Sequence, residues 1–301
     1  MSLLLDSFAP DVARVPVAFV NVYLVGTPDR WVVVDTGLPG AAGLVRRSAE
    51  ARFGPGSRPE AIVLTHGHFD HAGSALALAQ DWDVPVYAHR LEQPYLTGRS
   101  DYAPQDPTMG GAIAFLSRFF PSSGFDLGGY ARELPDDGSV PGAPGWRWLH
   151  TPGHTAGHVS LWRPSDRTLL AGDALATMDL DSWAAQLTKP RAFDRPPAPF
   201  TPDWSATRAS VHTLAELEPA VVAAGHGLPI TDRAAERLRS YDGTVEVPVG
   251  GRYGTTPAVA DETGVVAVPP PVPDPVLPRV AALAAGATVA AQLGRRLGRR
   301  G

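Results

Sequence analysis

The densest cluster of metal-ligating side chains lies in the segment THGHFDH, which carries His66, His68, Asp70 and His71. A packed core has no use for so many imidazoles and carboxylates, because burying them without partners is costly. Gly67 leaves the backbone free to turn, so that the first two histidines can face one ion and the next two ligands a second. Nitrogen and carboxylate ligands without thiolate suit zinc, iron or manganese.

Three further candidate ligands follow predicted strands, each beside a glycine. His154 lies in the segment HTPGHTAGH, Asp173 ends the segment LLAGD, and His226 lies in VVAAGHG. An apolar strand that ends in a ligating side chain can position that side chain at the edge of a rigid sheet. Each segment alone is a weak signal, but their order after the first cluster predicts one centre with seven ligands.

The elements that must position these residues alternate between strands and helices. Runs rich in β-branched and aromatic residues predict strands at 17–25, 31–35, 61–65, 84–88, 146–149, 159–162, 168–171 and 220–224. The first two of these strands are separated by a turn at 26–29. Helices are predicted at 39–53, 73–80, 110–120 and 204–217. This order is typical of a layered α/β domain whose helices cover the faces of a sheet.

We predict a catalytic domain over residues 1–241 and a C-terminal extension over residues 242–301. Two stretches rich in glycine, proline and aromatic residues, 90–144 and 176–202, interrupt the domain. They are interpreted as lids or binding loops, with plain surface insertions as the alternative. The extension holds a strand-like piece, a proline-rich connector and an alanine-rich helix over 277–301. We expect that helix to dock on the protein, and a membrane-surface or partner-binding role is the alternative.

Composition narrows the classes of partner. The chain has 301 residues, no cysteine and a formal net charge of −5, which gives no reason to expect nucleic acid. It has no stretch of the roughly 20 apolar residues that cross a bilayer, and its first residues lack the basic start of a secretory signal. We therefore expect a cytoplasmic protein that acts on a small molecule. The oligomeric state is left open, with a homodimer among the options.

The seven ligands, together with the early segment VVDTG at 33–37, resemble the pattern of the metallo-β-lactamase superfamily over residues 17–226. The resemblance implies an αββα sandwich with the metal site at the edges of its sheets. One ion would be held by His66, His68 and His154. The other ion would be held by Asp70, His71 and His226, with Asp173 bridging the two. Some true β-lactamases of this fold have a cysteine ligand, whereas none of these ligands is a cysteine. Destruction of antibiotics is therefore not the favoured role.

On this resemblance the protein is a hydrolase with two divalent ions, for which zinc is expected and iron or manganese are alternatives. Metal binding lowers the pKa of water from about 15.7 toward 7, and the resulting hydroxide would attack an ester, lactone or thioester carbonyl. Asp70 could return a proton to the leaving group. The alternatives are phosphodiester hydrolysis at the same site and an iron-dependent oxygenase similar to persulfide dioxygenases.

Four further residues are candidates for contact with the ligands or the substrate. Asp35 is expected to hold a loop or a ligand in place, and His158 either orients a ligand, meets the substrate or is purely structural. Lactonases of this fold use a tyrosine near the metals, for which Tyr102 and Tyr130 are the candidates. The first insertion also carries several aromatic residues, which favours a partly apolar organic substrate: Tyr95, Tyr102, Phe115, Phe119, Phe120 and Phe125.

Overall fold

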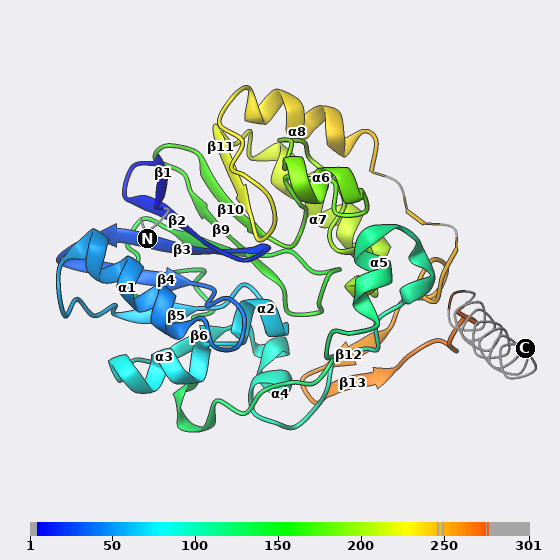
Figure 1. The fold of residues 1–301 in the computed structure, drawn as a ribbon, viewed down its shortest axis with the longest axis horizontal. Coiled ribbons are helices and arrows are strands. Elements are labelled where there is room, and N and C mark those ends of the chain that lie inside the picture. Colours follow the sequence, from blue (N-terminus) through cyan, green and yellow to red (C-terminus); the bar gives the residue numbers. More distant parts are fainter. Residues whose placement is uncertain (1–4, 246, 249, 275, 277–301) are drawn as a thin grey trace, which may run out of the picture.

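The computed structural model describes residues 5–245, 247–248, 250–274 and 276. Two β-sheets face each other, and helices cover the outer face of each sheet (Figure 1). The first sheet runs in the order β1-β2-β3-β4-β5-β6-β7. Its strands are β1 (Asp6–Ala9), β2 (Val12–Val17), β3 (Val20–Thr27), β4 (Arg30–Val34), β5 (Ala61–Val63), β6 (Val86–Ala88) and β7 (Ala131–Glu133). Pairing is antiparallel from β1 to β4 and parallel from β4 to β7.

The second sheet runs in the order β11-β10-β9-β8. Its strands are β8 (Arg147–His150), β9 (Val159–Arg163), β10 (Thr168–Gly172) and β11 (Val221–Ala224). The first three pair antiparallel, whereas β10 and β11 are parallel. Because the carboxyl ends of parallel strands meet at one edge of a sheet, the residues that follow β10 and β11 emerge side by side.

Alternation along the strands divides the apolar core into three layers. In β4, Val32 and Val34 pack between the two sheets, whereas Trp31 and Val33 pack against the helices on the outer face. Those helices are α1 (Ala42–Phe53) and α3 (Ala75–Trp82). Side chains alternate across a strand, so a fully buried strand must be apolar on both faces. This arrangement confirms the predicted α/β class and the αββα sandwich.

The second sheet shows the same division. Leu170 of β10 packs between the sheets, and its neighbours Leu169 and Ala171 face the other outer layer. That layer consists of α7 (Trp204–Glu216) and α8 (Ala234–Asp242). Helix α8 was not predicted from the sequence, whereas α7 was predicted to within one residue. The Asp203 side chain accepts a hydrogen bond from the Ala206 backbone N–H and so caps the start of α7.

The predicted strand at 17–25 begins on the last residue of β2 and continues into β3, and the rest of β2 was not predicted. The run 17–25 spans a tight turn, because Ala18 adopts a left-handed conformation with φ of 55° and Val17 pairs directly with Val20. The turn lacks the glycine or asparagine that normally marks a left-handed position, so composition alone predicted a continuous strand. Its position matters because Phe19 stands at the tip of this β2–β3 hairpin.

The predicted insertions contain more regular structure than their composition suggested. The first contributes β7 to the sheet and also holds η1 (Arg90–Glu92), α4 (Gln93–Leu96), η2 (Pro107–Met109), α5 (Gly111–Ser117) and η3 (Gly128–Tyr130). The second holds α6 (Trp183–Thr188) and η4 (Ala198–Phe200). The predicted helix at 110–120 is therefore shorter than expected, and α6 was missed.

The C-terminal extension packs on the first insertion. Its strand-like piece is a hairpin of β12 (Val259–Asp261) and β13 (Gly264–Ala267). The Val265 backbone N–H donates to the Ser100 hydroxyl over 3.2 Å. Farther along, Asp274 forms two short ion-pair contacts of 2.7 and 2.8 Å with Arg118, just after α5. The division into residues 1–241 and 242–301 stays a prediction, and the predicted helix at 277–301 lies outside the described residues.

Within the described part of the chain, none of the helices combines the length and the hydropathy that crossing a membrane requires.

Candidate metal centre

The loop after β5 delivers the first cluster of predicted ligands. β5 lies between two parallel neighbours, β4 and β6, and the chain then turns through His66 and His68 into α2 (Phe69–Ala72), which carries Asp70 and His71. The Thr36 backbone N–H donates to the His71 carbonyl oxygen over 2.7 Å. This contact ties the first turn of α2 to the loop that follows β4.

The second sheet delivers the remaining ligands to the same edge. His154 lies on the loop between β8 and β9, Asp173 directly follows β10, and His226 lies two residues after β11. A Cβ at Gly225 would lie 2.1 Å from Asp173 Oδ1 and 2.7 Å from His71 Cε1. Only glycine therefore allows the two parallel strand ends to approach each other and α2 this closely.

The seven predicted ligands converge on one buried cluster, which we call the candidate metal centre. Their ligating atoms form three groups in which all atoms lie within 4.8 Å of one another. These groups are His66 with His68 and His154, His66 with His71 and Asp173, and Asp70 with His71 and His226. The first and third groups match the two sets that the sequence analysis assigned to separate ions.

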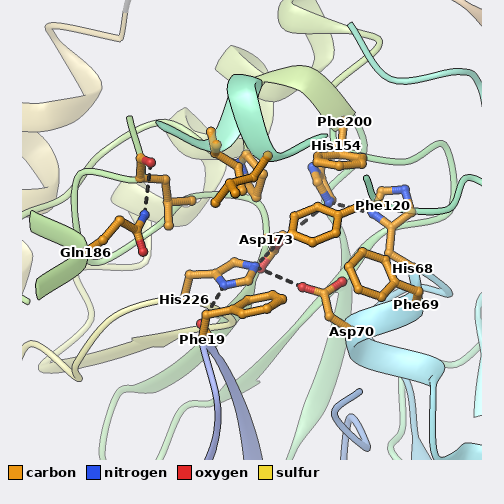
Figure 2. A pocket seen from close by; sticks show the side chains of 14 residues that line it. Phe19, His68, Phe69, Asp70, Phe120, His154, Asp173, Gln186, Phe200 and His226 are labelled. Carbon is orange, nitrogen blue, oxygen red and sulfur yellow. Dashed lines mark hydrogen bonds and ion pairs between the residues drawn. The ribbon is translucent and has the colours of Figure 1, made fainter. Parts of the chain in front are cut away.

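Asp173 stands at the middle of the candidate metal centre. Its Oδ2 lies 3.1 Å from Nε2 of His226, 3.5 Å from Nε2 of His154 and 3.6 Å from Nε2 of His71. The side chain thus reaches both predicted ion positions, and Figure 2 shows it between His154 and His226. Asp70 lies farther out, with its Oδ2 3.5 Å from His226 Nε2.

Asp35 holds two of the ligand histidines in a fixed orientation. Its Oδ2 accepts a hydrogen bond from Nδ1 of His71 over 2.8 Å, and its two oxygens also accept from the backbone N–H and the hydroxyl of Thr65. The Thr65 oxygen in turn lies 3.0 Å from Nδ1 of His66, which can donate to it. Both imidazoles then turn Nε2 toward the centre.

Two further histidines are oriented in the same way. Nδ1 of His226 donates to the Phe19 carbonyl oxygen over 2.9 Å. Nδ1 of His154 lies 3.1 Å from the hydroxyl of Thr201, which itself donates to the Pro197 carbonyl and is therefore the acceptor in this pair. Four histidines thus have an acceptor on one ring nitrogen and turn the other nitrogen toward the centre, where Nε2 of His154 lies 2.9 Å from Nδ1 of His68.

Several buried polar atoms of the centre lack a hydrogen-bond partner among the described residues. They are His66 Nε2, His71 Nε2 and Asp173 Oδ1. Leaving such atoms unpaired costs free energy, and all three belong to residues that the sequence analysis predicted as ligands. A pair of cations would satisfy them, so the residues present fit the predicted group.

Burial keeps the histidines of the first group neutral. Desolvation, together with neighbouring imidazoles, lowers the pKa of His68 to about 3 and moves the pKa of His66 and of His154 well below the usual range. A neutral imidazole is the form that binds a metal ion. At neutral pH all three rings therefore carry the lone pair that a ligand needs.

The two aspartates of the centre differ in how readily they take up a proton. Although burial opposes the charged form, the imidazoles of His226 and His71 hold the pKa of Asp173 well below its usual range. Burial raises the pKa of Asp70. The inner aspartate therefore stays ionised, whereas the outer one lies nearer the point at which it can take up a proton.

His158 contacts the backbone of a predicted ligand and does not line the pocket. Its Nε2 accepts a hydrogen bond from the Asp173 backbone N–H over 2.8 Å, and its Nδ1 lies 3.0 Å from the Thr151 carbonyl oxygen. Burial lowers the pKa of His158 to about 3, so the ring is neutral. Of the roles left open for it, this geometry supports orientation of a ligand.

The two candidate tyrosines lie in different places. The Tyr102 ring packs edge-on against His68, with centroids 4.4 Å apart, but its hydroxyl donates to the Glu92 carboxylate. Tyr130 lines a separate surface hollow with Asp83. The structure therefore brings Tyr102 to the centre with its hydroxyl engaged, and it does not bring Tyr130 there.

An apolar pocket opens directly onto the candidate metal centre (Figure 2). It encloses about 600 Å³ of space that no protein atom occupies, part of which is continuous with solvent. We call its hydrophobic lining the apolar wall: Phe19, Phe69, Ile113, Leu116, Phe120, Leu180, Pro197 and Phe200. Apart from the predicted ligands, Gln186 is the only polar residue among the described residues that line the pocket, and no arginine or lysine is among them.

A second hollow meets the first at His68, His154 and Phe200. It lies under the β12–β13 hairpin, whose Val259 and Val265 line it, and it too has no arginine or lysine among its described lining residues. In the part of the chain that the structure describes, the space on both sides of the His68–His154 pair is therefore free of cationic side chains.

Sequence reasoning found the ligands but missed most of their surroundings. Among the aromatic residues singled out in the first insertion, Phe120 lines the pocket, whereas Phe115 and Phe119 are exposed on its outside. Phe19 was missed because it lies within a run that resembled a continuous strand. Glu92, which is fully buried beside the centre, lies in a polar segment without any motif.

Comparison with known proteins agrees with this geometry. The family model described as the metallo-beta-lactamase superfamily matches residues 15–226. The probable metallo-hydrolase YflN of Bacillus subtilis (strain 168) is 43% identical over 229 residues, which cover 75% of this chain and 87% of that protein. A second probable metallo-hydrolase of that organism, YybB, is 28% identical over 214 residues, which cover 71% of this chain and 82% of the relative.

Solved structures share the fold. The B3 metallo-beta-lactamase BLEG-1 is similar with a TM-score of 0.50 and 26% identity, covering 70% of this chain and 88% of that chain. A metallo-beta-lactamase family protein of Thermus thermophilus has a TM-score of 0.52 and 21% identity, covering 78% and 79%. The chain therefore belongs to the metallo-beta-lactamase superfamily, and its histidine and aspartate groups are those of a metallo-hydrolase.

Proposed function

We propose that the protein hydrolyses a neutral carboxylic ester, lactone or thioester that carries an apolar group, with two divalent ions at the candidate metal centre. The observation that carries this proposal is the apolar wall, which faces Asp70 and His226 in a pocket whose described lining includes no cationic side chain. Apolar surface favours an apolar substrate through the hydrophobic effect. An anionic group that lies beyond the reach of the two ions would meet no cationic side chain among the described lining residues.

The orphaned nitrogens and the carboxylate oxygen of the centre support the dinuclear assignment. His66, His68 and His154 would hold one ion. Asp70, His71 and His226 would hold the other, with Asp173 between them. We assign zinc to both positions, because nitrogen and oxygen ligands suit it. When bound, the two ions lower the pKa of a water molecule and polarise a carbonyl oxygen.

The residues of the chain supply binding, orientation and proton transfer. The apolar wall would hold the apolar part of the substrate and keep bulk water away from it. Asp70 lines the same pocket and would carry a proton to the oxygen or sulfur atom of the leaving group. Asp173, held ionised by its neighbours, would stay in place throughout.

A substrate series with the zinc-loaded protein tests this function. The series contains neutral esters with acyl chains from acetyl to octanoyl, a lactone, a thioester and an anionic aryl phosphodiester. Each added methylene contributes about 0.8 kcal/mol on burial, so kcat/KM should rise roughly fourfold per methylene until the pocket is filled. Protein stripped with a chelator should be inactive until zinc is restored.

Two results would overturn the proposal. Faster hydrolysis of the phosphodiester than of every neutral ester would assign the site to phosphodiester hydrolysis. Bound iron, with oxygen uptake on a persulfide and no ester hydrolysis, would assign it to oxygen chemistry.

A further inference from the structure

Glu92 is a fully buried acid that no part of the proposed mechanism uses. It ends η1, the short helix after β6, and its side chain is completely inaccessible. Burial raises the pKa of this carboxyl group, whereas its hydrogen bonds oppose that shift. A buried carboxylate costs free energy unless several hydrogen-bond donors satisfy it.

Four donors surround the carboxylate. Oε1 accepts from the Thr155 hydroxyl over 2.6 Å and from the Gly157 backbone N–H over 3.0 Å. Oε2 accepts from the Gly67 backbone N–H over 3.0 Å and from the Tyr102 hydroxyl. Each oxygen therefore faces one backbone donor and one hydroxyl donor.

Three of these donors belong to the loops that carry the first group of candidate ligands. Gly67 lies between His66 and His68, Thr155 directly follows His154, and Gly157 lies on the same loop as Thr155. The first loop comes from one sheet and the second loop comes from the other. Glu92 is thus a bridge of side-chain hydrogen bonds between the two loops whose histidines share the first predicted ion.

We propose that Glu92 is a positioning residue that sets the distance between the His66–His68 loop and the His154 loop, and so fixes the affinity of the first ion position. This inference rests on the proposed dinuclear function. It does not extend to the second position, whose histidines have other anchors: Asp35 for His71 and the Phe19 carbonyl for His226.

The geometry requires a carboxylate and not merely a polar side chain. Whichever way a glutamine is placed, its NH₂ group points at one of the two backbone N–H donors, and a donor facing a donor leaves both unsatisfied. Space is also tight, because a Cβ at Gly157 would lie 2.8 Å from Glu92 Cγ. The loops therefore have to shift if the carboxylate is replaced.

Cobalt titration of the metal-free protein against a competing chelator tests this inference without any substrate. The two ion positions are separated by background variants. His226→Ala disables the second position and leaves the first, whereas His68→Ala does the reverse. In the His226→Ala background, adding Glu92→Gln should weaken cobalt binding by about 10-fold to 100-fold, the usual effect of removing a residue that supports a ligand. In the His68→Ala background the same change should have less than about a threefold effect.

The visible absorption of bound cobalt gives a second readout, because it reports the arrangement of ligands around the ion. Glu92→Gln should alter the spectrum of the first position only. Thr155→Val, which removes one hydroxyl donor and keeps the carboxylate and both backbone contacts, should weaken binding there by a smaller factor.

Leu238→Ala serves as the matched control for a general loss of stability. Leu238 is a fully buried residue of α8 that packs in the outer core layer of the second sheet, so its truncation should lower the melting temperature without changing either cobalt affinity. Equal cobalt affinity with and without Glu92→Gln would overturn the positioning role. So would equal weakening by Leu238→Ala and Glu92→Gln. Absence of cobalt binding by the unmodified protein would instead contradict the proposed function itself.

Discussion

The candidate metal centre and the apolar wall face the same pocket but are built in opposite ways. Most ligands of the centre are oriented by hydrogen bonds to neighbouring residues, such as Asp35 on His71 and the Phe19 carbonyl on His226. The wall comes from a hairpin tip, short helices and the loops beside them, and its aromatic rings pack against one another. Phe120 lies with its ring centroid 5.9 Å from that of Phe19 and 5.1 Å from that of Phe69.

The centre therefore carries the chemistry, and the wall selects the substrate. A ligand held by directional bonds keeps its geometry while the substrate changes, as catalysis requires. A wall held by ring packing on connecting segments can change shape without disturbing the sheets. Substitutions in the centre should therefore act on kcat and metal affinity, whereas those in the wall should act on KM.

The largest expected effect lies at the border between the two regions. Asp70→Asn should lower kcat by about 10³-fold, because a positioned acid that protonates the leaving group contributes typically about 10² to 10⁴. Metal content and steady-state kinetics on one ester check this. Near-full turnover with both ions bound would remove Asp70 from the chemistry and leave it as a ligand only.

A smaller effect is expected from the support of the centre. Asp35→Asn places an amide group against the donors of His71 and Thr65. Metal affinity should fall by about 10-fold to 100-fold, as for other partners of ligand histidines. A chelator competition experiment measures the change. Unaltered affinity would mean that the centre does not depend on these directional bonds, which breaks the comparison with the wall.

A substitution in the apolar wall should change KM and leave kcat nearly unaltered. Phe120→Ala removes the ring that contacts both Phe19 and Phe69, so KM for an octanoyl ester should rise about 10-fold, a loss near 1.4 kcal/mol of binding. KM for the acetyl ester and kcat for both should change little. A fall in kcat with unchanged KM would show that the wall takes part in the chemistry.

The smallest expected effect comes from a buried histidine outside both regions. Burial, with His150 and Arg90 nearby, lowers the pKa of His89 to about 4. Its unfolded form takes up a proton near pH 6.5 while the folded form does not, so stability is lost as the pH falls from 6.5 toward 4.

Replacing His89 tests whether this residue lowers the stability of the protein at acidic pH. As the pH falls from 6.5 toward 4, the unfolding free energy of metal-free His89→Asn should decrease by about 1 kcal/mol less than that of the unmodified protein, after allowance for solvent screening. Urea unfolding at pH 6.5 and pH 4.5 measures the difference. An equal loss in both proteins would show that His89 does not contribute to acid sensitivity.

The contrast between the two regions also explains what the sequence could predict. His154, Asp173 and His226 stood out because each follows an apolar strand and lies beside a glycine, and these local features position the ligands in the structure. The family and the layered fold, both confirmed, depend on the same local pattern. The residues that position each of these ligands and the sequence pattern that predicts the ligand lie in the same short segment.

The wall and the supporting contacts depend on residues that are distant in sequence. Phe19 reaches the pocket only because Ala18 adopts a left-handed turn, and nothing in the run of β-branched residues marks that turn. Glu92 becomes important only when two loops from different sheets fold around it. Tyr130 and Tyr102 were equal candidates by the resemblance to lactonases of this fold, and tertiary packing alone separated them.

The most direct test of the account is the metal content of the protein purified without added metal, measured by elemental analysis beside the Asp173→Ala variant. We expect about two zinc ions per chain, and fewer in the variant because Asp173 contacts histidines of both groups. No bound metal, or the same content after Asp173→Ala, would contradict a centre in which this aspartate joins two ion positions.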